Sequence, residues 1–430
     1  MSIESINRKQ DDGRLTMIGF LVGITPALMA LAPWDFGSEM TNFRALMRGN
    51  SLIVPIIELC CIFWALRLKL ELFETIRSFP LPEKIALAIL VSIAAFTSIC
   101  VANDIPNALM GLLAWLVHAL FGIAVFQIAS RSVKVEISSI YISVSVGFFA
   151  YLFILAAYIP TIESPAQYNW TGLMPGLPNI RSLGYFSVAG VAAGAAISFG
   201  TSRKSYFLLG LFIGAAAFGL AVWSATRGAL FALSATSIFL FICRFKYRNL
   251  PFVGWVASAI AIGVLLSAAA YKPTDQFGLK RLFASVENSG GSIDRLSAGR
   301  VQIWKDTIAR IEERPLFGYG ERQFRKVGPL NARGLNQPHN IFLQIAFQWG
   351  IVGAVLFFLL LARIVLRVWR QRDHGNNIGI GEQILIISTL VYSLYDAALF
   401  YPYPIMMFTL AVAIALAHST QPAPAGDMSD

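Results

Sequence analysis

The sequence predicts an all-α fold, a polytopic integral membrane protein with about twelve transmembrane helices and one long loop that contains helices. Hydrophobic residues make up 56% of the 430 residues, charged residues only 13%, and the mean hydropathy is +0.64. A soluble domain of this length is far less apolar. Apolar runs of roughly 17 to 25 residues recur, long enough for a helix to cross a bilayer, and the alternating pattern of a membrane barrel is absent.

These apolar runs define the predicted spans and divide the chain into four parts. We expect spans at residues 17–33, 51–67, 84–102, 107–129, 137–160, 183–200, 206–223, 227–243, 251–270, 341–362, 383–399 and 403–418. The first run is expected to stay as a span and not to be cleaved as a signal peptide. The parts are the spans within 1–270, a loop at 271–340 that carries polar motifs, the spans within 341–418, and a tail at 419–430 expected to be disordered.

The distribution of basic residues predicts the orientation. Arginine and lysine are frequent in the loops on the side of both termini, so both termini are expected to be cytoplasmic. The short loops on the opposite side hold few basic residues, which are Arg44, Arg48, Arg181 and Arg227. The long loop lies on that second side, and its basic residues outnumber its acidic ones. Since the chain carries a net charge of +10, an anionic partner such as lipid head groups or a phosphorylated substrate is expected.

Two structural elements are expected inside the long loop. Residues 297–313 predict a helix with Val301, Trp304, Ile308 and Ile311 on one face, lying along the membrane surface or simply covering the bundle. Residues 315–320 predict a tight turn, because two glycines flank an aromatic residue there.

Two arginines are candidates for binding an anion. Arg227 lies between two apolar runs, where a charge next to hydrocarbon is costly without a partner. Its alternative role is to snorkel to lipid phosphates. Arg300 falls in the first turn of the expected loop helix, where free backbone N–H groups favour anions and a guanidinium adds bidentate recognition of phosphate. A surface salt bridge is the alternative for Arg300.

His339 is the candidate general base. Of the four histidines it alone is placed at the outer membrane boundary, just after Pro338 and before an apolar run. An imidazole can take a proton from a sugar hydroxyl near neutral pH, although a histidine that caps a helix would give the same pattern. The sequence has no nucleotide-binding Walker loop, no zinc ligand cluster and no serine nucleophile elbow, so chemistry driven by ATP is not expected.

Several motifs resemble those of a known family. The segments Arg314–Gly320, Pro338–Gln344 and Trp349–Gly353, with Ser297–Trp304 and Ser224–Gly228, are similar to the O-antigen ligase and O-antigen polymerase superfamily of bacterial membrane glycosyltransferases. The resemblance implies a metal-independent, inverting transfer of glycan from an undecaprenyl-diphosphate carrier, at the periplasmic side of the inner membrane and without a cofactor.

The resemblance also implies roles for individual residues. Arg227 and Arg300 would hold the diphosphate and offset the charge that develops on the leaving group, and His339 would deprotonate the acceptor hydroxyl. Arg181 would be a third phosphate ligand. The other residues expected to bind substrate or orient the histidine are Tyr319, Asn340 and Gln344.

Three functions are compatible with these motifs. The first is an O-antigen ligase that joins polysaccharide to lipid A–core in lipopolysaccharide assembly. The second is an O-antigen or exopolysaccharide polymerase that acts on carrier-linked repeat units, and the third is a flippase or other transporter of lipid-linked oligosaccharides. The expected partners are the carrier-linked glycan donor, the lipid A–core acceptor and membrane lipids, with neither nucleotides nor nucleic acids among them. Few buried carboxylates besides Glu58 are visible, which disfavours an ion-coupled transporter.

Overall fold

The predicted all-α membrane fold is confirmed by a computed structural model. It describes residues 3–31, 52–68, 70, 72–131, 137–170, 174–177, 179–244, 250–287, 290, 294, 297–329, 335–370 and 379–419. No β-strand occurs in these ranges, and eight of the helices there are long and apolar enough to cross a membrane. The predicted disordered tail beyond residue 419, and Arg44 and Arg48, lie outside the described residues.

A helix lies at every predicted span. The helices of the first part are α1 (Ile3–Leu31), α3 (Ile53–Arg67), α4 (Leu72–Arg77), α5 (Leu81–Phe96), α6 (Ile105–Arg131), α7 (Ile137–Tyr158), α8 (Leu183–Phe199), α9 (Lys204–Trp223), α10 (Arg227–Arg244) and α11 (Leu250–Ala269). The loop contributes α12 (Gly278–Glu287), α14 (Arg300–Glu313) and α15 (Phe324–Val327), and the last part α16 (Ile341–Arg370), α17 (Ile380–Asp396) and α18 (Pro402–Ser419). Short helical segments include η2 (Thr97–Val101), η4 (Ile180–Ser182) and η7 (Ala398–Phe400).

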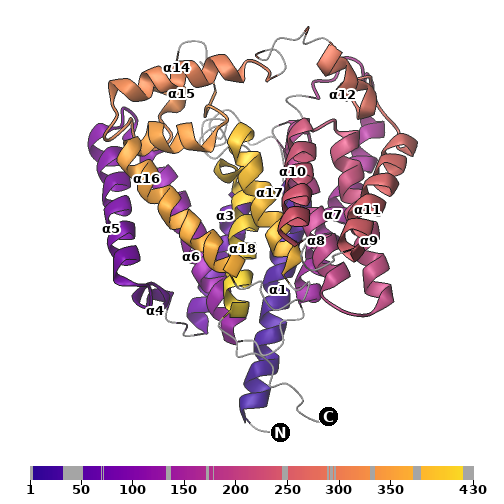
Figure 1. Ribbon diagram of the computed structural model, residues 1–430, viewed down its shortest axis with the longest axis horizontal. Coiled ribbons are helices and arrows are strands. Elements are labelled where there is room, and N and C mark those ends of the chain that lie inside the picture. Colours follow the sequence, from indigo (N-terminus) through magenta and orange to yellow (C-terminus); the bar gives the residue numbers. More distant parts are fainter. Residues whose placement is uncertain are drawn as a thin grey trace.

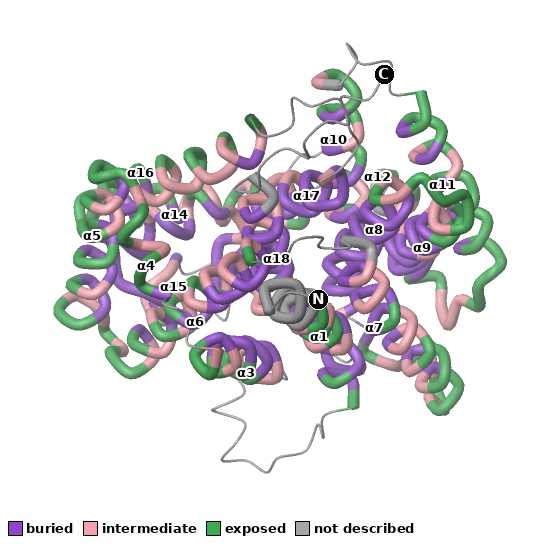
Figure 2. The backbone as a smooth tube through the Cα atoms, turned by 90° about the horizontal axis from the view of Figure 1, so that it is seen from below, coloured by how far each residue is buried: buried purple, intermediate pink, exposed green. Residues whose placement is uncertain are grey.

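The bundle has two distinct ends. The first residue of α1 and the last of α18 lie at one end, which we call the terminal end, while α12, α14 and α15 cover the other, the loop end (Figure 1). Helix α8 is buried on nearly all sides and packs against α7, α9 and α17 (Figure 2). Its sequence is rich in glycine and alanine, and such small side chains let neighbouring helices approach closely within a membrane.

Helix α16 is broken near the loop end, and the loop repairs the break. Gly350 has φ +70° and ψ 178°, so the helical hydrogen bonding stops there. The backbone N–H groups of Tyr319 and Gly320 donate to the carbonyls of Phe347 and Gln348, at 2.8 and 2.9 Å. The loop therefore satisfies carbonyls that a broken helix would otherwise leave without partners.

The predicted tight turn at residues 315–320 is confirmed. This turn is the part of the loop that contacts the break in α16. Gly318 and Gly320 have φ +62° and +90°, angles that favour glycine. The backbones are in direct contact, since a Cβ added to Gly350 would lie 2.0 Å from the carbonyl oxygen of Leu316. The two glycine-containing motifs thus form one structural unit.

The predicted loop helix is present with two corrections. It begins at Arg300 and not at residue 297, because Ala298 and Gly299 both have positive φ and form a turn. Its buried face contains Thr307 and Ile311, whereas Ile308, predicted to lie on that face, is 46% exposed. The face is rotated because Ile311 packs with the aromatic rings of the loop and α16. Helix α14 runs across the loop end of the bundle (Figure 1).

Candidate active site

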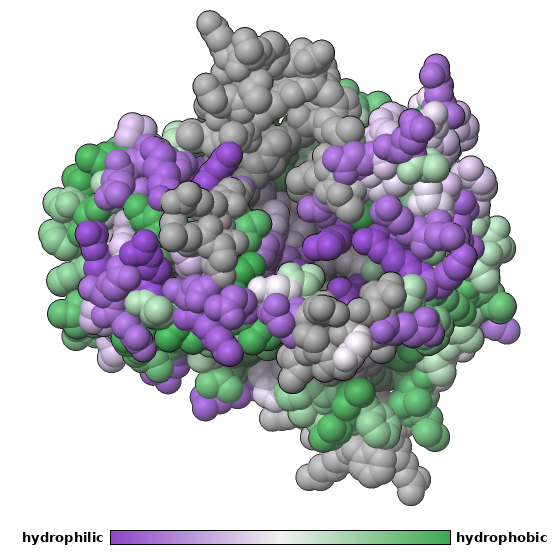
Figure 3. Space-filling view, turned by 90° about the horizontal axis from the view of Figure 1, so that it is seen from above, coloured by the Kyte–Doolittle hydropathy of each residue, from purple (hydrophilic) through white to green (hydrophobic). Residues whose placement is uncertain are grey.

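Four arginines surround a cavity of about 150 Å³ at the loop end. Arg181 belongs to η4, Arg227 is the first residue of α10, Arg281 lies on α12, and Arg300 is the first residue of α14. We call this space the arginine cavity. Hydrophilic residues gather around a hollow on this face of the molecule (Figure 3). Segments far apart in sequence therefore bring their cations to one place.

The arginine cavity has an excess of positive charge. Asp396 is the one carboxylate among its described lining residues. The pKa of Arg281 is lowered, first by burial and then by the positive charges of Arg181 and Arg227. Cations held close enough to disfavour one another's charge create a strong attraction for an anion.

Asp396 connects the cavity to His339. One carboxylate oxygen of Asp396 lies 3.3 Å from Nη2 of Arg300 and 3.0 Å from Nδ1 of His339, and the other accepts a hydrogen bond from the Tyr185 hydroxyl at 3.2 Å. In the tautomer that protonates Nδ1, the imidazole donates to Asp396 and keeps a lone pair on Nε2. In that tautomer Nε2 of His339 would be able to accept a proton, close to the Arg300 guanidinium.

The backbone is strained around these residues. Of five described non-glycine residues with positive φ, Ala225, Ala298, His339 and Ala397 are site residues or lie within two positions of one, and the fifth is Arg322. Each such angle costs a non-glycine residue about 1–3 kcal/mol, and the surrounding structure must hold it in place. Strain of this kind concentrates at functional sites.

Comparison with known proteins shows a partial similarity to one protein family. Residues 209–358 match a family model described as O-antigen ligase. About a third of the chain is therefore similar to this family. It is also 26% identical over 155 residues to an O-antigen ligase of Pseudomonas aeruginosa, an alignment that covers 36% of this chain and 33% of that protein. The chain thus matches about a third of that relative's length.

The segment that matches the O-antigen ligase family holds only part of the site. Arg227, Arg281, Arg300 and His339 fall within the matched residues. Arg181 precedes the match and Asp396 follows it, although both line the arginine cavity. The complete site therefore needs helices on both sides of this segment.

The family motifs also explain how His339 is positioned. Trp304 on α14 donates its indole N–H to the carbonyl of Pro338 at 2.9 Å, which ties the loop helix to the start of α16. Asn340 accepts from the backbone N–H of Leu343 at 3.1 Å and donates to the carbonyl of Leu394 on α17 at 2.8 Å. The residues on either side of His339 are thus anchored to separate helices.

Of the four predicted substrate-binding residues, Arg181 lines the cavity, whereas Tyr319, Asn340 and Gln344 do not. The hydroxyl of Tyr319 donates to the carbonyl of Arg310, and its ring stacks on Phe347 at 4.7 Å. Gln344 is fully buried in α16, and its amide has no hydrogen-bond partner among the described residues. The structure gives Tyr319 contacts that hold the loop against α16.

Sequence reasoning missed Asp396 and Arg281. Asp396 ends an apolar helix, and a lone carboxylate at such a boundary is the signal that could have marked it. Arg281 is one basic residue among many in the long loop, and nothing local distinguishes it.

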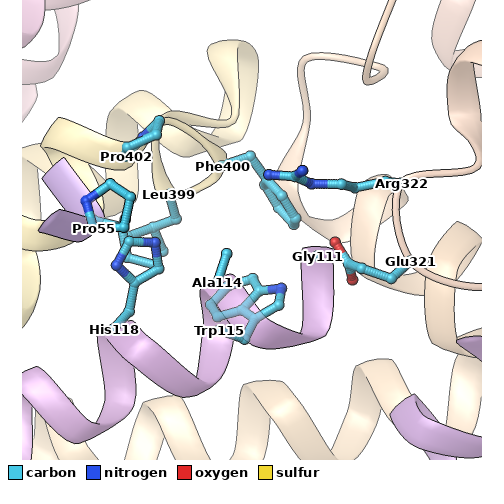
Figure 4. A pocket seen from close by; sticks show the side chains of 11 residues that line it. Pro55, Gly111, Ala114, Trp115, His118, Glu321, Arg322, Leu399, Phe400 and Pro402 are labelled. Atoms are coloured by element: carbon cyan, nitrogen blue, oxygen red, sulfur yellow. The ribbon is translucent and has the colours of Figure 1, made fainter. Parts of the chain in front are cut away.

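A second cavity, of about 50 Å³, is lined in part by residues of the α17–α18 connection (Figure 4). Glu321 and Arg322 face it from the loop and His118 from α6. His118 Nδ1 is 2.7 Å from a carboxylate oxygen of buried Glu58, and Glu321 accepts from Gln348 at 2.8 Å. We call it the His118 cavity. His118 and Glu321 are thus each bonded to a buried residue that lies outside the lining of the cavity.

Proposed function

We propose that this chain is an O-antigen ligase that transfers polysaccharide from undecaprenyl diphosphate to lipid A–core in lipopolysaccharide assembly. One observation carries the proposal: four arginines converge on a cavity that Asp396 joins directly to a histidine. Guanidinium groups match the geometry of phosphate oxygens, and a histidine held by a carboxylate is suited to remove a proton from a hydroxyl.

The proposed reaction is a single displacement with inversion. His339 Nε2 takes the proton of an acceptor hydroxyl while that oxygen forms a bond to the anomeric carbon of the donor sugar. The bond between the anomeric carbon and the phosphate oxygen breaks, and the carrier diphosphate leaves with the electron pair. Arg227, Arg300 and Arg281 offset the charge that builds on this leaving group, and Asp396 stabilises the imidazolium.

In this reaction the guanidinium groups do the work that a divalent cation does in other phosphate chemistry, so we propose that the transfer needs no metal. We also propose that the loop end faces the periplasm of a bacterial inner membrane, with both termini cytoplasmic. The asymmetry of basic residues and the shared end of α1 and α18 support this orientation. Thiol labelling from the periplasm should reach Arg300→Cys and not Arg367→Cys.

The main alternative is a polymerase, whose acceptor is a second carrier-linked repeat unit. Both reactions use the same donor and the same base, so the acceptor distinguishes them. Transport of the lipid-linked glycan is a weaker alternative, because the candidate residues gather at one end of the bundle and do not line a path through it.

The decisive experiment is reconstitution of purified protein in vesicles without nucleotide. Carrier-linked glycan is offered with lipid A–core or with a second carrier-linked repeat unit, and the product is identified by mass spectrometry. We expect transfer to lipid A–core, lost in His339→Ala. Transfer only to the second repeat unit would establish the polymerase, and movement of the glycan across the vesicle without a new bond would establish a transporter.

A further inference from the structure

Tyr392 of α17 lines the arginine cavity and has a hydroxyl group without a partner in the protein. The residue is only 2% exposed, and its hydroxyl group makes no hydrogen bond to any of the described residues. Burying a polar group without a partner is costly, so nearly all buried hydroxyl groups in proteins are hydrogen-bonded. The exception at Tyr392 indicates a partner that comes from outside the chain.

The packing of three helices brings the Tyr392 hydroxyl to this place. Asp396 follows four positions later on α17, so both side chains project from the same face of the helix. A Cβ added to Gly184 of α8 would lie 2.6 Å from the Tyr392 hydroxyl oxygen, and one added to Gly228 of α10 would lie 2.5 Å from its ring. The two glycines therefore leave the space that the tyrosine ring occupies between α8 and α10.

Two neighbouring tyrosines show the contrast. The rings of Tyr185 and Tyr395 lie 5.0 and 5.6 Å from that of Tyr392. The hydroxyl of Tyr185 donates to Asp396, and that of Tyr395 donates to the carbonyl of Gly228. Both of these hydroxyl groups are thus bonded within the protein. Of the three, Tyr392 keeps its donor for a ligand.

The charges around the arginine cavity indicate which ligand fits. A guanidinium group has only donors, so the cavity arginines cannot accept the hydrogen of the Tyr392 hydroxyl. The one carboxylate among the described lining residues, Asp396, is already bonded to Tyr185, Arg300 and His339. A phosphate group brings several acceptor oxygens, which can bond the guanidinium groups and a hydroxyl group at the same time.

We infer that Tyr392 is a substrate-binding residue whose hydroxyl donates a hydrogen bond to a phosphate oxygen of the diphosphate in the arginine cavity. This inference rests on the proposed function. A hydroxyl group adds a donor for the anion without adding a charge. That is an advantage in a cavity where the positive charges already disfavour one another.

The test is binding of inorganic diphosphate to the full-length protein in lipid nanodiscs, measured by titration calorimetry. Tyr392→Phe keeps the ring and removes only the hydroxyl group, and we expect its affinity to fall about tenfold, the scale of a hydrogen bond to a charged group. Tyr151→Phe is the matched control. Tyr151 is buried in α7 outside the cavity lining, and its hydroxyl donates to the carbonyl of Pro175 at 3.0 Å. Its diphosphate affinity should equal that of the wild type.

Thermal unfolding of the same variants gives a second readout. Without diphosphate, Tyr392→Phe should melt at the wild-type temperature or above it, because the lost hydroxyl group had no partner, whereas Tyr151→Phe should melt at a lower temperature. Added diphosphate should raise the melting temperature of the wild type more than that of Tyr392→Phe. A hydroxyl group that only supported the fold would give a lower melting temperature with full affinity.

Equal diphosphate affinity in the wild type and in Tyr392→Phe would overturn the inference, as would a wild-type protein that binds no diphosphate. The readout does not depend on transfer, so the two proposals can fail separately. If the wild type transfers glycan while Tyr392→Phe binds diphosphate normally, only this inference is wrong. If diphosphate binding depends on Tyr392 but no glycan is transferred, only the proposed function is wrong.

Discussion

The arginine cavity and the His118 cavity are both lined in part by residues at or next to the α17–α18 connection, and they differ in how their charges are balanced. Among the described residues that line the first, four guanidinium groups face a single carboxylate. In the second, His118 is bonded to Glu58 and Glu321 to Gln348. His118 and Glu321 therefore each have a buried partner behind the lining of the second cavity. An excess of one charge is stabilised only when a ligand supplies the opposite charge.

The largest effect is expected at the base. His339→Ala should lower the transfer rate by ~10²-fold or more while carrier affinity stays near that of the wild type, because the imidazole acts on the acceptor. Asp396→Asn should reduce the rate to a similar extent, because the amide can no longer stabilise the imidazolium. Carrier affinity measured beside the rate for each folded variant separates binding from chemistry. Loss of carrier binding in His339→Ala would reassign the histidine as a phosphate ligand.

A smaller effect on transfer is expected when an arginine of the cavity is replaced by lysine, which keeps the positive charge but not the planar guanidinium group. Arg227→Lys and Arg300→Lys remove bidentate hydrogen bonds to phosphate, and a hydrogen bond to a charged group contributes roughly 1.5–3 kcal/mol. We therefore expect roughly tenfold or greater losses in both carrier affinity and turnover. Arg325→Lys, at an exposed position of α15 outside the cavity, is the matched control. Wild-type behaviour of Arg300→Lys would show that charge alone is sufficient.

The smallest effect on transfer is expected in the His118 cavity. His118→Ala leaves the buried Glu58 carboxyl group without its hydrogen bond, which costs about 1–3 kcal/mol of stability. We expect a lower melting temperature but an unchanged rate per folded molecule. Replacing both residues, in Glu58→Leu/His118→Leu, should recover part of the stability because no polar group is then left alone. A large loss of rate in stable protein would place this cavity in the reaction.

The two cavities also show which features of the fold and the site can be predicted from the sequence. The spans follow from apolar runs alone, since hydropathy is a local property. Arg227, Arg300 and His339 could be named from motifs, but their convergence could not. Asp396 lies 96 positions from Arg300 and 57 from His339, so only the packing of α17 against the loop reveals the carboxylate that joins them. The motif predicts Tyr319 near the substrate, yet its backbone N–H donates to Phe347 beside the break in α16 and its ring stacks on that residue.

That break has a consequence for exchanging parts between members of the family. The turn at residues 315–320 and the carbonyls that it satisfies on α16 belong to one unit, and their backbones touch at Gly350. A chimera that takes the loop from a related protein but keeps α16 of this chain would combine a turn and a helix from different proteins. Their backbone contacts would then not match. The junction of such a chimera should lie beyond Gly353, inside the continuous part of α16. The loop and the first turns of α16 are then taken from the same protein.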